Sequence, residues 1–206
     1  MCANIIDRAE PFTLQDIKMS FTVGDFWSWN QSNLLSNTLR GALAEFIVAK
    51  ALDIPLDRAR DDWTPFDLVY QAKDRPINIE VKSSAYIQAW EQCKLSTISF
   101  SIAPSRAWIN QKYIGEPKRH AHLYVFCLHA FQDLERKNDA NPLALDQWDF
   151  FIIDTIHLNA LPINQRSISL PSLISLAPVR CTYLELKATI DSTIEKITAV
   201  LTDSSD

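Results

Sequence analysis

Residues 66–82, FDLVYQAKDRPINIEVK, contain the pattern that most restricts how this chain can fold. Within residues 77–82, β-branched residues alternate with polar ones, which is typical of a strand that buries one face. A polar segment at residues 72–75 separates this strand from a second apolar run. We therefore expect an antiparallel hairpin with a four-residue loop, in which Gln71 faces Pro76.

In this register Asp67 faces Glu80, and Lys82 shares the face of Glu80 because strand side chains alternate. Directly opposed Cβ atoms lie about 4.5–5.5 Å apart, and like charges at that distance destabilise an ordinary sheet. A divalent cation between the carboxylates would remove this repulsion, and oxygen ligands suit Mg²⁺ or Mn²⁺. Asp/Glu-x-Lys occurs five times in the chain, but this is the only occurrence on an alternating strand.

The order of a helix, several strands and a final helix predicts one α/β or α+β domain over residues 1–206. Apolar periodicity predicts a long helix that begins at Ser32 or Ser36 and ends near Leu52. A capping box formed by Thr182 and Glu185 opens a C-terminal helix over about residues 183–201. We also expect a short helix after Thr13 and a turn with buried tryptophans at GDFWSW. Further strands are expected at residues 97–102, 122–128 and 148–154.

Composition excludes several classes of protein. The chain has only 3 glycines, in positions that cannot form a P-loop, a G-x-G-x-x-G motif or a G-x-S-x-G elbow. Four widely separated cysteines and the absence of an apolar leader predict a cytoplasmic protein with reduced thiols. The net charge is −5, yet residues 36–120 carry 12 Lys/Arg against 10 Asp/Glu. This local excess of basic residues weakly indicates a polyanionic partner.

Glu45 in the long helix, Asp67 after TPF, and IEVKSS together resemble the PD-(D/E)xK nuclease superfamily. The resemblance implies the restriction-endonuclease-like fold, an α/β fold with a central mixed β-sheet flanked by helices. The resemblance covers roughly residues 37–102. One departure is that Phe66 separates the aspartate from Pro65.

The resemblance implies a metal-dependent DNA endonuclease that uses Mg²⁺ or Mn²⁺ and acts as a homodimer. Asp67, Glu80 and the Val81 carbonyl would bind the metal, and Glu45 would be an outer or second-metal ligand. Lys82 would assist the attacking water. The expected DNA contacts are Arg40, Ser83, Ser84 and Gln88 near the motif, and Lys112, Lys118 and Arg119 in a loop.

Less specific interpretations remain open for each residue. Glu45 could be a surface carboxylate paired with Lys50 or Arg40. Asp61 or Asp62 could replace Asp67 as the ligand. Glu80 and Lys82 could form a plain ion pair on a strand. The protein could also be a nucleic-acid-binding or structural member of the same fold without catalytic activity, or an unrelated domain.

Overall fold

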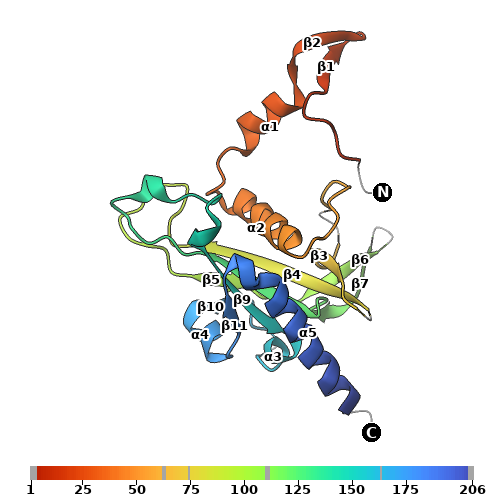
Figure 1. Ribbon diagram of the computed structural model, residues 1–206, viewed down its shortest axis with the longest axis vertical. Coiled ribbons are helices and arrows are strands. Elements are labelled where there is room, and N and C mark those ends of the chain that lie inside the picture. Colours follow the sequence, from red (N-terminus) through yellow and green to blue (C-terminus); the bar gives the residue numbers. More distant parts are fainter. Residues whose placement is uncertain (1–3, 62–63, 74, 110–111, 163, 204–206) are drawn as a thin grey trace.

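The computed structural model describes residues 4–61, 64–73, 75–109, 112–162 and 164–203. The body of the molecule is built around a mixed five-stranded sheet, and an N-terminal segment extends away from it (Figure 1). The order of the sheet is β11-β9-β8-β4-β3. Its strands are β3 (Leu68–Gln71), β4 (Pro76–Ala85), β8 (Leu123–His129), β9 (Trp148–Asp154) and β11 (Val179–Cys181).

The expected hairpin register is confirmed. β3 and β4 are antiparallel, and their partners include Leu68 with Ile79 and Gln71 with Pro76. β4 is parallel to β8, whereas β8 with β9 and β9 with β11 are antiparallel. The sheet is therefore mixed, as the resemblance implied, and β4 lies between β3 and β8.

Two helices cover one face of the sheet. α2 (Asn37–Ala51) begins at Ser36, whose side chain accepts the Leu39 amide, and α5 (Leu186–Asp203) follows the short 3₁₀ helix η3 (Tyr183–Glu185). The capping box of Thr182 and Glu185 is present. Both helices pack on the apolar side of β4, β8 and β9 in one hydrophobic core.

The other face of the sheet buries a second core around Phe100, Phe126 and Phe151. Short elements cover it: β5 (Ser99–Ser101), β10 (Ser167–Ser169), α3 (Thr155–Asn159) and α4 (Leu170–Ser175). β5 and β10 form a separate antiparallel pair. Two further 3₁₀ helices, η1 (Lys137–Asp139) and η2 (Leu145–Gln147), precede β9. The molecule is an α/β fold whose central sheet is flanked by helices.

The N-terminal segment differs from the sequence-based expectation. Instead of a helix after Thr13, β1 (Pro11–Leu14) and β2 (Ile17–Thr22) form a hairpin. Its two loop residues, Gln15 and Asp16, have positive φ values of 48° and 67°. Two successive left-handed residues are the conformation of a two-residue hairpin turn, which Asp tolerates better than most residues.

The expected turn at GDFWSW is also wrong. Thr22 and Asp25 form a capping box that opens α1 (Val23–Gln31), and Trp29 is 81% exposed rather than buried. Side-chain oxygens that satisfy the first amides of a helix outweigh the weak propensity of this segment. Among the helices that the structure describes, none is both long and apolar enough to cross a membrane.

Candidate active site

Asp67 lies at an open edge of β4, because β3 begins only at Leu68 and β4 continues to Ala85. The Asp67 amide donates to the Ile79 carbonyl at 3.1 Å, and the Val81 amide donates to Asp67 Oδ2 at 2.7 Å. The Asp67 carboxylate thus accepts the hydrogen bond of a β4 amide that has no partner residue in β3. Extending the register by one residue would pair Asp67 with Glu80. Asp67 instead precedes β3 and is not among the paired residues of the two strands.

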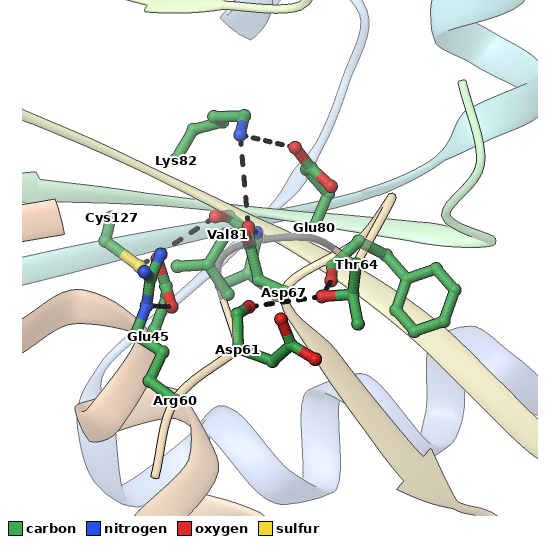
Figure 2. Close-up of polar contacts among 11 residues, drawn as sticks. Glu45, Arg60, Asp61, Thr64, Asp67, Glu80, Val81, Lys82 and Cys127 are labelled. Carbon is green, nitrogen blue, oxygen red and sulfur yellow. Dashed lines mark hydrogen bonds and ion pairs between the residues drawn. The ribbon is translucent and has the colours of Figure 1, made fainter. Parts of the chain in front are cut away.

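Lys82 nevertheless brings the two carboxylates into one cluster. Its Nζ is in contact with Glu80 Oε1 and lies 3.9 Å from Asp67 Oδ2 (Figure 2). The three side chains are only 17–26% exposed. The period of two along β4 places Glu80 and Lys82 on one face, as the sequence predicted. The opposite face of β4 packs against α2. Two partly buried carboxylates therefore share one ammonium group.

The surroundings of Asp67 disfavour the ionised form of its carboxyl group. Burial and the neighbouring Glu80 carboxylate raise the pKa of Asp67, while Lys82, the Val81 amide and Arg60 act against this rise. Burial and Glu80 also raise the pKa of Tyr124, which is the partner of Glu80 on β8. An additional cation would reduce the repulsion between the Asp67 and Glu80 carboxylates, because an opposite charge favours the ionised form.

Glu45 faces a different partner on the other side of the sheet. Arg60 binds it with two hydrogen bonds, from Nε to Oε2 at 2.5 Å and from Nη2 to Oε1 at 2.7 Å (Figure 2). The side chain of Glu45 is 12% exposed and that of Arg60 is 48% exposed. The hydrogen bond from Arg60 to Glu45 raises the pKa of the guanidinium. The alternative in which Glu45 pairs with Lys50 or Arg40 is not seen, because its partner is Arg60, a loop residue 15 positions away.

Figure 2 places Glu45 and Arg60 on one side of Asp67, and Lys82 with Glu80 on the other. Beside Glu45, α2 and the segment before Asp67 enclose a largely apolar cavity of ≈ 480 Å³. Its walls include Ala42, Phe46, Ile54 and Leu56. Gly41, in the same helix, has nothing within 4 Å of where a Cβ would stand, so it is not required for close packing.

The carboxylate oxygens of Asp67 and Glu80 suit a hard divalent cation, but a metal site here would also need a backbone oxygen. Within the described residues, no three His, Cys, Asp or Glu side chains gather to hold a metal ion. The amide of Val81 points to Asp67, and in a strand the carbonyl of a residue points to the same edge as its amide. Asp67, Glu80 and the Val81 carbonyl would supply the oxygen ligands that Mg²⁺ or Mn²⁺ prefers.

Asp61 and Asp62 are the alternatives to Asp67 as a metal ligand, and the structure describes only the first of them. Asp61 lines the cavity, and its carbonyl accepts from Thr64 Oγ1 at 3.4 Å. Asp62 lies outside the described residues. Thr64 also donates to the Phe66 carbonyl at 2.7 Å, which fixes the approach of the chain to Asp67.

Arg40 and Gln88, expected at the DNA surface, are tied to each other. Arg40 is 4% exposed, and its Nη1 donates to the Leu35 carbonyl at 3.1 Å and to Gln88 Oε1 at 3.2 Å. Burial lowers the pKa of Arg40 to about 10. Arg40 is therefore poorly exposed for the expected DNA contact. The pair instead joins the start of α2 to the segment that follows β4.

The other expected contacts divide in the same way. Arg119 is 8% exposed and donates from Nε to the Ile102 carbonyl at 3.0 Å, so it too is poorly exposed for the expected DNA contact. Ser84 is 8% exposed and Ser83 is half-buried within β4. Lys112 and Lys118 are exposed, but on a β-hairpin rather than in the expected loop.

Arg60 is the residue that sequence reasoning missed. It lies in a loop between two acidic stretches, and helical spacing directs attention to Arg40 and Lys50 instead. No local pattern announces a pair that spans 15 residues, so only the tertiary structure could identify it.

Comparison with known proteins places these residues in a family. A similar solved structure, that of the bacterial homing endonuclease I-Ssp6803I, is 17% identical, covers 66% of this chain and 78% of its own, and has a TM-score of 0.36. That likeness is too weak to carry an argument. No curated protein sequence matches the chain.

The family model described as bacteriophage T4 endonuclease IV matches residues 17–161. This range is more than half of the 206-residue chain, and it contains Glu45, Asp67, Glu80 and Lys82. The chain belongs to the bacteriophage T4 endonuclease IV family.

Proposed function

We propose that this protein is a metal-dependent DNA endonuclease of the PD-(D/E)xK type, which hydrolyses phosphodiester bonds with Mg²⁺ or Mn²⁺. The observation that carries the proposal is that Asp67 and Glu80, two partly buried carboxylates, share a single ammonium group, Lys82. Membership in an endonuclease family supports the reaction class. The site then has a physical reason to take up a further cation.

Asp67, Glu80 and the Val81 carbonyl would hold the metal ion. A divalent cation bound there would stabilise the negative charge that develops on the phosphate during hydrolysis. Asp67 is held in place through the Val81 amide, so its carboxylate is already oriented before any ligand arrives. Such preorganisation limits the reorganisation needed during the reaction.

Lys82 has its ammonium against both carboxylates, and it is the group best placed to orient a water molecule or a phosphate oxygen beside them. Glu45 has a secondary role in this proposal. Its carboxylate is engaged by Arg60, so it can act as a ligand only after that ion pair opens.

A plain ion pair on a strand, in a DNA-binding protein without catalytic activity, is the alternative function. The contact between Lys82 and Glu80 would fit it. Asp67 argues against it, because a second carboxyl group with a raised pKa at the same lysine adds repulsion and no evident structural benefit. A homodimer remains part of the proposal, since cutting both strands of a duplex requires two sites of this kind.

Nicking of supercoiled plasmid by the purified protein tests the proposal. We expect nicking in Mg²⁺ or Mn²⁺ and none in chelator. The Asp67→Asn variant, which keeps an acceptor for the Val81 amide, should lose the activity. Cleavage by wild type in chelator, or undiminished cleavage by Asp67→Asn in Mg²⁺, would contradict the proposed site. A branched DNA and an RNA of the same length identify the preferred nucleic acid.

A further inference from the structure

An N-terminal lobe, residues 4–31, stands apart from the body of the molecule and contains the β1–β2 hairpin and α1 (Figure 1). Backbone hydrogen bonds hold its parts together. The Val23 amide donates to the Glu10 carbonyl at 2.9 Å, and the next amide, that of Gly24, donates to the Arg8 carbonyl at 2.7 Å. A Cβ at Gly24 would lie 2.9 Å from the same Arg8 oxygen, so this close approach requires glycine. The lobe therefore has a defined structure of its own.

One face of the hairpin in this lobe is entirely apolar. Leu14 and Ile17 are opposed across the two strands, and opposed residues share a face. The rings of Phe12 and Phe21 have their centroids 4.9 Å apart. Met19 lies on the same face, because strand side chains alternate along β2. We call these five residues the apolar face of the lobe.

The apolar face is exposed to solvent. Its five side chains are 37–67% exposed, and none of the residues 4–39, all of which the structure describes, is buried. Antiparallel strands that alternate apolar and polar residues ordinarily pack the apolar side on a core. A two-stranded hairpin without such packing is at best marginally stable in water. The face thus has the pattern of a buried surface, and the described part of the chain leaves it uncovered.

A second hairpin shows how this protein builds a ribbon that stays in solvent. β6 (Ser105–Ile109) and β7 (Lys112–Lys118) pair with each other outside the central sheet. Every residue of β7 is exposed, and three of its seven residues are charged. The ten residues of β1 and β2 include one charge, that of Lys18. Because charged residues on a free strand discourage association, β1–β2 is the hairpin that is suited to contact another protein surface.

The exposed area and the charge of the lobe both favour a protein partner over nucleic acid. Nine large apolar side chains between Ile5 and Trp29 are 37–81% exposed. Together they expose about as much area as five whole side chains, or roughly 700–1,000 Å². The largest apolar patch of a monomer is ordinarily about 300–600 Å², whereas a stable interface buries about 800 Å² of each partner. The charged residues of the lobe are Arg8 and Lys18 against Asp7, Glu10, Asp16 and Asp25. This negative balance repels a polyanion.

We propose that two copies of this chain associate lobe to lobe, with the apolar face of one hairpin packed on the same face of the other across a twofold axis. A twofold axis brings the same patch of both copies together, so apolar residues meet apolar residues. Sheets packed face to face lie about 10 Å apart, a gap that side chains from both faces fill. Such a dimer goes beyond the proposed function and needs no nuclease activity, because only the lobe forms it.

Sedimentation velocity over a range of protein concentrations tests the lobe contact. Interfaces of this size have micromolar or lower dissociation constants, so wild type should be a dimer at about 100 μM. Leu14→Glu/Ile17→Glu places like charges in the contact and should raise the dissociation constant at least about 100-fold. The matched control, Thr13→Glu/Ser20→Glu, adds the same charge to the opposite face of the hairpin. Its dissociation constant should stay within about 3-fold of wild type.

Hydrogen exchange on wild type tests the same contact without a substitution. Amides of residues 11–22 should exchange at least about 10-fold more slowly at high than at low protein concentration, because association protects them, and the body should not change. Slower exchange in the body but not in residues 11–22 would overturn the lobe-to-lobe contact.

A wild type that stays monomeric at about 100 μM would overturn the inference and leave the apolar face to a different protein. Equal dissociation constants for wild type and Leu14→Glu/Ile17→Glu would overturn it as well. Plasmid nicking decides separately on the proposed function. A monomeric wild type that nicks in Mg²⁺ keeps the proposed active site and loses the lobe contact, whereas a dimer that fails to nick does the reverse.

Discussion

The molecule has two neighbouring carboxylate clusters, and they differ in their charge balance. One is Glu45 with Arg60, and the other is Asp67 and Glu80 with Lys82. On the α2 side, Glu45 accepts two hydrogen bonds from Arg60, whose positive charge also acts on Asp67. On the opposite side, Glu80 and Asp67 share the single ammonium of Lys82. The first cluster is neutral as it stands, whereas the second carries one more negative charge than positive. This difference indicates that a bound cation would be stabilised most by the negative charge of Asp67 and Glu80.

The same comparison separates structural from chemical roles. A bidentate Arg–carboxylate pair has a fixed geometry and restrains the segment that holds Arg60 against α2. A lysine between two carboxylates has a looser geometry and can turn toward another ligand. Under the proposed function we therefore expect a mainly structural role for the Glu45–Arg60 pair, and we propose a catalytic role for the Lys82 cluster.

The largest expected effect comes from Lys82→Ala. Loss of an ammonium that stabilises the transition state should reduce the rate of Mg²⁺-dependent cleavage about 100- to 1,000-fold. DNA affinity in Ca²⁺ should change little, because one phosphate contact contributes a small part of the backbone electrostatics. Single-turnover kinetics and anisotropy measure the two effects.

Lys73→Ala is the matched control for Lys82→Ala. Lys73 lies in the β3–β4 loop, its side chain is 89% exposed, and its ion pair with Glu195 is 4.0 Å long. This variant should cleave at the wild-type rate. Wild-type cleavage by Lys82→Ala would refute the catalytic assignment, and equal losses of rate and affinity would make Lys82 a binding residue.

A smaller effect is expected on stability from the Glu45–Arg60 pair. Because Arg60 is half exposed, Glu45→Gln and Arg60→Gln should each lower the free energy of unfolding by about 1 kcal/mol. In a chain of this length that corresponds to a Tm lower by about 2–4 °C. A double-mutant cycle in urea should give a coupling energy of about 0.5–1 kcal/mol. A coupling energy of zero would remove the structural role of this pair.

The smallest expected effect is a pH dependence with opposite signs in two variants. The pKa of Asp67 is raised above 3.8 in the folded protein, so the folded state binds more protons and the free energy of unfolding falls as pH rises through this range. In metal-free buffer, Asp67→Asn should therefore gain stability relative to wild type as pH rises from about 4 to 7.

Asp53→Asn supplies the opposite case. The hydrogen bond from Lys187 lowers the pKa of Asp53 below 3.8, so this carboxylate stabilises the protein above that pH and loses its effect as pH falls. Relative to wild type, Asp53→Asn should therefore lose stability as pH rises to about 4. Melting temperatures across this pH range check both signs. Curves for Asp67→Asn parallel to wild type would contradict the electrostatic account of the site.

Local patterns in the sequence predicted the parts of the fold that local physics determines. Alternation fixed the β3–β4 register, because a shift by one residue would turn every apolar side chain of β4 outward. Apolar periodicity and Ser36 located α2, and the capping box located the start of the C-terminal helix region. Glu80 and Lys82 share a face for the same reason.

The missed features depend on longer-range contacts or on turn geometry. Gln15 and Asp16 adopt left-handed conformations in a hairpin, although the preceding threonine resembles a helix cap. Arg40 and Arg119 read as surface cations, yet the fold buries both against backbone carbonyls. The Arg60–Glu45 pair joins a loop to a helix, and no periodicity connects those positions.

Isothermal titration calorimetry with Mn²⁺ on wild type, Asp67→Asn and Glu45→Gln tests the central claim most directly. The charge balance of the two clusters predicts that Asp67→Asn loses Mn²⁺ affinity at least about 10-fold, since removing a ligand or its support typically costs this much. Glu45→Gln should retain affinity within about 2-fold, because Arg60 already neutralises Glu45. Equal Mn²⁺ affinity in wild type and Asp67→Asn would contradict the claim and move the metal site toward Asp61 and Asp62.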